Sequence, residues 1–172
     1  DINYLALSGV ASYSGRAESG PPPLGIQVAD VAGGSHHAVM GILAAVTHQR
    51  HTGEGQHVDI SMTDATFAMN TMGGAAWLAA GEEPEPEGGM LNGGAFYDYY
   101  QTADGRWLSV GSLEPPFAKQ LFSVIGRPEL AAKGLSPKSE DQKTLRSALR
   151  DAIAGKTLAE WQAIFDEQDA CV

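Results

Sequence analysis

The first half of the chain carries a hydrophobic pattern that predicts strands and helices separated by turns rich in glycine. Residues 4–10 predict a short strand or an extended segment, and residues 12–24 predict a loop rich in Gly, Ser and Pro. Residues 31–49 are apolar on nearly all sides, which predicts a helix inside a core. Alternation over 58–62 predicts a second strand, and the following stripe of small residues predicts a helix opened by a Ser61–Asp64 capping box.

The second half begins with a proline- and glutamate-rich stretch over residues 81–89, which interrupts the pattern and marks the best domain boundary. Beyond it, residues 96–110 predict a hairpin that turns at Asp104-Gly105. Three helices are predicted after the hairpin: one opened by Pro115-Pro116, one around 145–153, and one capped by Thr157 and Glu160.

The order of elements predicts an α/β fold in its first part and a smaller α+β fold in its second part. We expect a large domain over residues 1–80, a linker over 81–95 and a small α+β domain over 96–172.

Composition narrows the class of protein. The chain has 172 residues, 43% of them hydrophobic and 19% charged, as in an ordinary globular protein. Its net charge of -10, without a basic cluster, argues against a nucleic-acid partner. No apolar run reaches the roughly 18 residues that span a bilayer, and Cys171 has no partner for a disulfide. We expect no membrane association and a cytoplasmic location. The start without Met or signal peptide indicates an internal fragment.

Asp30 is the first candidate for chemistry, because it lies between a short apolar run and the predicted interior helix. Aspartate is a favoured N-cap residue, so a structural cap is one interpretation. The other is an acid–base or nucleophilic carboxylate, with the amides at the helix start able to stabilise an anion. The local pattern alone favours the cap.

Glu114 is the second candidate, between a strand end and the helix opened by prolines. A glutamate near a helix start is favoured by the helix dipole, which is the simpler interpretation. The two prolines would also stiffen the loop and fix the direction of the carboxylate. His48 and His51 have a spacing that suits a metal pair, but no further ligand cluster supports one, so we expect no metal site.

Several motifs, in order, resemble family III CoA-transferases of the CaiB/BaiF type, and most closely the α-methylacyl-CoA racemase branch. The similar segments are Asp1-Ile-Asn-Tyr4, Val28-Ala-Asp30 with Gly33-Gly34, residues 51–56, residues 58–62, Gly111-Ser-Leu-Glu114-Pro115, residues 126–130 and residues 169–172. The match runs nearly end to end, and it changes the preferred interpretation of Asp30 and Glu114 from structural to catalytic.

The resemblance implies the latter part of a Rossmann-like large domain plus a small α+β domain, a partial family III fold from a parent that forms an interlocked homodimer. It implies an acyl-CoA thioester as substrate and no separate cofactor. Asp30 and Glu114 would be catalytic, and a catalytic histidine would precede Asp1. Asp1 and Tyr4 would lie near CoA. The acyl-facing residues would be Met62, Met69 and Met72.

The implied reaction inverts the α-carbon of a 2-methylacyl-CoA by two-base proton transfer through an enolate. One alternative within the family is CoA transfer, in which Asp30 attacks a thioester as a nucleophile. The other is an inactive dimerisation or CoA-binding fragment, and the piece alone is expected to have little activity.

Overall fold

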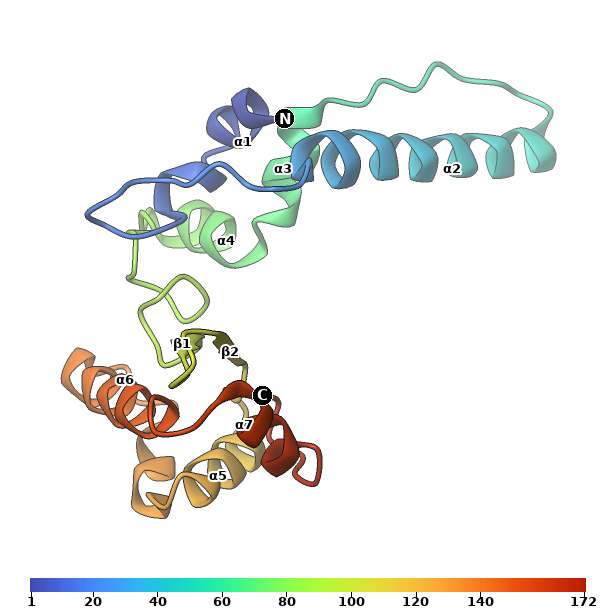
Figure 1. Cartoon of the computed structure of the whole chain (residues 1–172). Helices are drawn as coiled ribbons and strands as arrows, with labels where there is room; N and C mark the ends of the chain where they lie inside the picture. Colours follow the sequence, from blue (N-terminus) through green and yellow to red (C-terminus); the bar gives the residue numbers. More distant parts are fainter. The chain divides into compact units, whose positions relative to one another are not determined.

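The computed structural model describes all 172 residues, which form two compact units, Asp1–Pro86 and Glu87–Val172. The division falls within the predicted 81–95 linker. The first unit contains helices and loops only, and the second contains both strands of the chain (Figure 1).

The first unit holds six helical elements. In chain order these are α1 (Ile2–Leu7), the 3₁₀ helix η1 (Val10–Tyr13), the π-helix η2 (Val28–His36), α2 (His37–Thr52), α3 (Met62–Met69) and α4 (Thr71–Ala80). The strands predicted over 4–10 and 58–62 are both wrong. Residues 4–10 are helical or turn, and residues 58–61 are extended but unpaired, because a strand needs a hydrogen-bonding partner and this unit offers none.

The extended segment returns along α2 instead (Figure 1). A Cβ atom at Gly41 of α2 would lie 2.9 Å from Val58 Cγ1 and 3.2 Å from Ile60 Cδ1. The absence of a side chain at Gly41 therefore lets the extended chain approach the helix closely.

The helix predicted over residues 31–49 is present, but it does not lie inside a core. Residues 28–36 form a π-helix, and α2 continues from it, but α2 contains no buried residue. Leu43, for example, is 60% exposed. The prediction of an interior helix is wrong for this chain, because the other elements of the unit do not surround α2 and its apolar sides face outward.

The best-packed contact of the first unit joins η2 to α3. Cβ atoms at Gly33 and Gly34 would lie 2.6 Å from Thr66 Oγ1 and 3.0 Å from Met62 Cγ. The two glycines thus allow the helices to touch through their backbones. Thr66 is fully buried there, and its hydroxyl has no hydrogen-bond partner.

A break at Asn70 separates α3 from α4, where the sequence predicted one helix. The Tyr13 hydroxyl donates to Asn70 Oδ1 at 2.6 Å, which stabilises the break across 57 residues of sequence. Burial raises the pKa of the Tyr13 phenol, so it remains a donor. At the other end of α3, Ser61 Oγ accepts from the Asp64 amide at 3.2 Å, so Ser61 caps the helix. The second half of the predicted capping box, a bond from the Ser61 amide to the Asp64 side chain, is not formed.

The second unit follows its sequence pattern closely. Its elements are β1 (Asp98–Gln101), β2 (Trp107–Val110), α5 (Pro115–Val124), the 3₁₀ helix η3 (Pro128–Lys133), α6 (Ser139–Ile153) and α7 (Leu158–Phe165). The strands pair antiparallel with Asp98 opposite Val110 and Gln101 opposite Trp107, and Gly105 turns the chain at a φ of 71°. The predicted hairpin and helix caps are confirmed, including the Thr157–Glu160 capping box.

The core of the second unit lies between the hairpin and the helices. Its buried members are Phe96, Tyr100, Leu108, Val110, Ala118, Leu121, Phe122, Leu130, Leu145, Leu149, Ile153, Trp161, Phe165 and Ala170. Gln142, also buried, accepts from the Phe96 amide at 3.2 Å and donates to the Gly134 carbonyl at 3.0 Å. This continuous core gives the loop that carries Glu114 a rigid base.

Candidate functional site

Asp30 lies in the first turn of η2 and does not cap it. Gln27 occupies the N-cap position, and its side chain makes no hydrogen bond to the start of the helix. The Asp30 side chain is 46% exposed. The capping interpretation of Asp30 is therefore wrong, and its carboxylate is accessible to a ligand.

Asp1 supplies the acceptor that the helix start needs. Its Oδ1 accepts hydrogen bonds from the Ala29 amide at 2.6 Å and from the Asp30 amide at 3.1 Å. The terminal ammonium group of Asp1 forms an ion pair with Asp30 Oδ1 at 2.9 Å. The two hydrogen bonds to the Asp1 carboxylate fix the start of η2 against the start of α1.

The two hydrogen bonds to Asp1 change the chemistry that the sequence suggested. We expected the amides beside Asp30 to be available for a reaction anion, but the Ala29 and Asp30 amides already donate to Asp1. The role of Asp1 at the helix start is one that sequence reasoning missed. No local signal could have shown it, because 28 residues separate Asp1 from Ala29.

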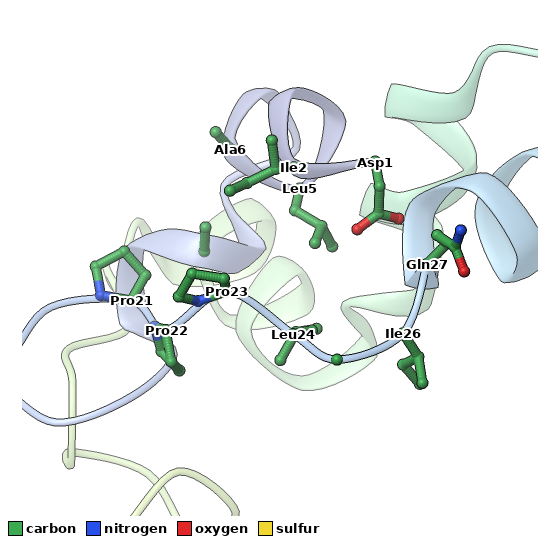
Figure 2. Close-up of a pocket in the computed structure, with 12 residues that line it drawn as sticks. Asp1, Ile2, Leu5, Ala6, Pro21, Pro22, Pro23, Leu24, Ile26 and Gln27 are labelled. Carbon is green, nitrogen blue, oxygen red and sulfur yellow. The ribbon is translucent and has the colours of Figure 1, made fainter.

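An apolar crevice of about 570 Å³ opens beside Asp1. Its lining residues are Asp1, Ile2, Leu5, Ala6, Ala11, Pro21, Pro22, Pro23, Leu24, Gly25, Ile26 and Gln27. Figure 2 shows Leu5 and Leu24 between the α1 side and the proline-rich side, with Asp1 and Gln27 together at one end. Three consecutive prolines make one wall stiff, because each fixes its own φ. The Asp30 side chain does not line the crevice, but the Asp30 amide donates to Asp1, which does.

The other candidates of the first unit lie at separate places. Tyr4 is exposed on α1, outside the lining of the crevice. Met62 is half-buried against Gly34 of η2, whereas Met69 and Met72 are exposed near the break between α3 and α4. None of the three methionines lines the crevice. Met62 is therefore the one that packs against the helix that carries Asp30.

Glu114 occupies the N-cap position of α5 in the second unit, but its side chain makes no capping hydrogen bond. Its carbonyl accepts from the Ala118 amide at 2.9 Å, and Pro115 and Pro116 form the first positions of the helix. The carboxylate is exposed and has no hydrogen-bond or ion-pair partner. The backbone is thus fixed while the carboxylate is free to bind.

The chain contains no group of three or more His, Cys, Asp or Glu side chains that could hold a metal ion. None of the helices combines the length and the apolar character needed to cross a membrane.

Comparison with known proteins decides the family. The sequence model of CoA-transferase family III matches residues 1–172, the whole chain. The chain belongs to CoA-transferase family III. Human and mouse α-methylacyl-CoA racemases are each 40% identical to it, over 100% of this chain and 45% of theirs. A succinyl-CoA:mesaconate CoA-transferase of Haloarcula hispanica is 30% identical over 98% of this chain and 40% of its own length.

Solved structures give the same fold. A hypothetical protein from Mycobacterium tuberculosis aligns with a TM-score of 0.73 at 23% identity, over 98% of this chain and 45% of that one. A CaiB/BaiF family protein from Brucella suis also has a TM-score of 0.73, at 21% identity. The chain therefore has a partial family III fold and spans about half the length of the relatives it matches.

Proposed function

We propose that the family III enzyme that contains this chain is a racemase acting on the α-carbon of 2-methylacyl-CoA thioesters. The observation that carries the proposal is the 40% identity to two α-methylacyl-CoA racemases along the whole chain. The CoA-transferases among the relatives are 28–31% identical.

The chemistry requires one acid–base group on each face of the α-carbon, since a proton leaves one face and another returns to the opposite face. We assign Asp30 to one face. Its side chain is 46% exposed, so the carboxylate is accessible to a substrate. The resemblance implies a histidine before Asp1 for the other face, with Glu114 supporting it.

We propose that the crevice beside Asp1 takes an apolar part of the acyl-CoA. Leu5, Leu24 and the proline wall offer an apolar surface, while Asp1 and Gln27 offer polar groups at one end. The family resemblance supports Asp1 and Tyr4 near the CoA portion and Met62, Met69 and Met72 near the acyl chain. Of these residues, Asp1 alone lines the crevice. CoA enters as part of the substrate, and the reaction as written needs no further cofactor.

We also propose that the parent enzyme is an interlocked homodimer located in the cytoplasm. The exposed apolar side chains of α2 support the dimer, because a helix with apolar residues on all sides is stable when it is covered. The covering surface would come from the rest of the parent or from the second copy.

CoA transfer is the second candidate function, and the accessibility of Asp30 favours it equally. A nucleophilic carboxylate must reach the thioester carbonyl, and Asp30 is exposed enough to do so. Transferases are also among the relatives. A third candidate is an inactive fragment, because the chain spans 45% of the length of the racemases.

One set of assays separates the three. The enzyme is incubated with a chiral 2-methylacyl-CoA in deuterated water without an acceptor acid, and incorporation of deuterium at the α-carbon is followed. A racemase exchanges the proton under these conditions. A transferase does not, but with an acceptor acid it forms an acyl-enzyme that hydroxylamine traps. Loss of both activities in the enzyme would leave only the non-catalytic interpretation.

A further inference from the structure

The loop Gly111–Glu114 connects β2 to α5 and carries the free carboxylate of Glu114. Unlike an ordinary surface loop, it is held from a distant part of the chain. Ser112 is 0% exposed, and its hydroxyl donates to the carbonyl of Ala170. The Gly111 amide donates to the carbonyl of Cys171 at 2.9 Å. Both bonds join the loop to the segment that follows α7.

The approach of the two segments leaves little room for a side chain at Gly111. A Cβ atom at Gly111 would lie 3.2 Å from Cys171 Sγ and 3.3 Å from the Cys171 carbonyl oxygen. Cys171 itself has a φ of 55°, a left-handed conformation that costs energy for a residue other than glycine. The contact is thus maintained against a local backbone cost.

The other side of Glu114 is also fixed. The Leu113 amide donates to the Gly111 carbonyl at 2.8 Å, which tightens the loop. Pro115 and Pro116 then restrict the backbone at the helix start. Glu114 is therefore placed between two restrained segments, while its own side chain has no partner in the described chain.

We propose that Ser112 is a positioning residue, which holds the Glu114 carboxylate in its working place through the hydrogen bond to Ala170. This role rests on the proposed function of Glu114 as the group that supports the second acid–base residue. An alanine at position 112 removes the donor and leaves the buried Ala170 carbonyl without that bond. The loop can then shift, and a displacement of about 1 Å at a catalytic group is enough to lower the rate strongly.

The test compares Ser112→Ala with Thr102→Val in the active enzyme. Thr102 is also buried in the second unit, and its hydroxyl donates to Asp104 at the hairpin turn. Both variants remove the hydroxyl hydrogen bond of a buried side chain, although the bond of Thr102 is only part-buried. We expect a decrease in unfolding temperature for both, and a smaller one for Thr102→Val. We measure kcat and KM of α-proton exchange, and the hydrogen exchange of the Gly111 and Leu113 amides.

We expect Ser112→Ala to lower kcat about tenfold or more with KM within about twofold, and to speed amide exchange at both positions. Thr102→Val should change neither. Unchanged kcat in Ser112→Ala, or an equal loss in Thr102→Val, would overturn the positioning role. If the wild-type enzyme exchanges no α-proton, the proposed function fails. In that case, the amide exchange rates still test whether Ser112 restrains the loop. Faster exchange in Ser112→Ala but not in Thr102→Val would support the restraint, and unchanged exchange in Ser112→Ala would overturn it.

Discussion

Replacing Asp1 by alanine tests the least expected contact of the structure. The Asp1 carboxylate accepts from two amides at the start of η2, at 2.6 and 3.1 Å. Loss of a helix-capping acceptor costs about 0.5–2 kcal/mol. The Asp1 side chain is 20% exposed, so water can replace only part of the lost interaction. We therefore expect a loss of about 1–2 kcal/mol of local stability at the helix start.

The assay is hydrogen exchange of the Ala29 and Asp30 amides, followed by NMR. A loss of 1–2 kcal/mol corresponds to an increase of about 5–30-fold in exchange rate if exchange occurs by local opening. Asp1→Asn keeps one acceptor oxygen and should show a smaller increase. Glu18→Ala removes one negative charge from an exposed loop of the same unit and serves as the control. Equal exchange rates in Asp1→Ala and Glu18→Ala would refute the capping role of Asp1.

Three further predictions concern the core, the acid stability and the crevice. Thr66→Val should raise stability by about 1 kcal/mol in urea unfolding, since the buried hydroxyl has no partner; a loss of stability would contradict this. The hydrogen bond from Thr102 lowers the pKa of Asp104 in the folded protein. The bond to the ionised carboxylate therefore stabilises the fold above about pH 4, and this stabilisation is lost as the pH falls through the pKa of the folded protein. Asp104→Asn should reduce the loss of stability on acidification. Ala6→Phe should narrow the crevice and raise KM for a long-chain acyl-CoA about threefold or more without lowering kcat. The control Ala75→Phe, on the exposed side of α4, should leave KM unchanged. Equal KM values for the two variants would exclude the crevice from substrate binding.

Local signals explain why the second unit was predictable. Pro115 and Pro116 open α5, and Thr157 with Glu160 caps α7, and each of these signals acts within one helical turn. The turn at Gly105 likewise depends on residues within the hairpin. Such features need no information from distant residues, and the sequence pattern predicted all of them.

Non-local contacts explain the errors in the first unit. The alternation of Val58 and Ile60 is typical of a strand, but a strand forms only where another strand pairs with it. The break at Asn70 depends on the Tyr13 hydroxyl, which belongs to a different helix. The hydrophobic pattern of one segment does not show whether a pairing strand or a distant hydroxyl group is present.

The candidate site divides in the same way. The short motifs identified Asp30 and Glu114 through their resemblance to the family, and the structure leaves both carboxylates exposed. The partners of the site came only from the structure. Asp1 reaches the helix start across 28 residues, and Ser112 reaches Ala170 across 58.

The most direct test of the proposed racemase is deuterium incorporation at the α-carbon by Asp30→Asn in the complete enzyme. The amide has nearly the same shape but cannot accept the proton, so we predict a loss of exchange by a factor of about 10² to 10⁴. Asp59→Asn, at an exposed aspartate outside the site, should exchange at the wild-type rate. Exchange by Asp30→Asn at close to the wild-type rate would contradict the assignment of Asp30 as an acid–base group.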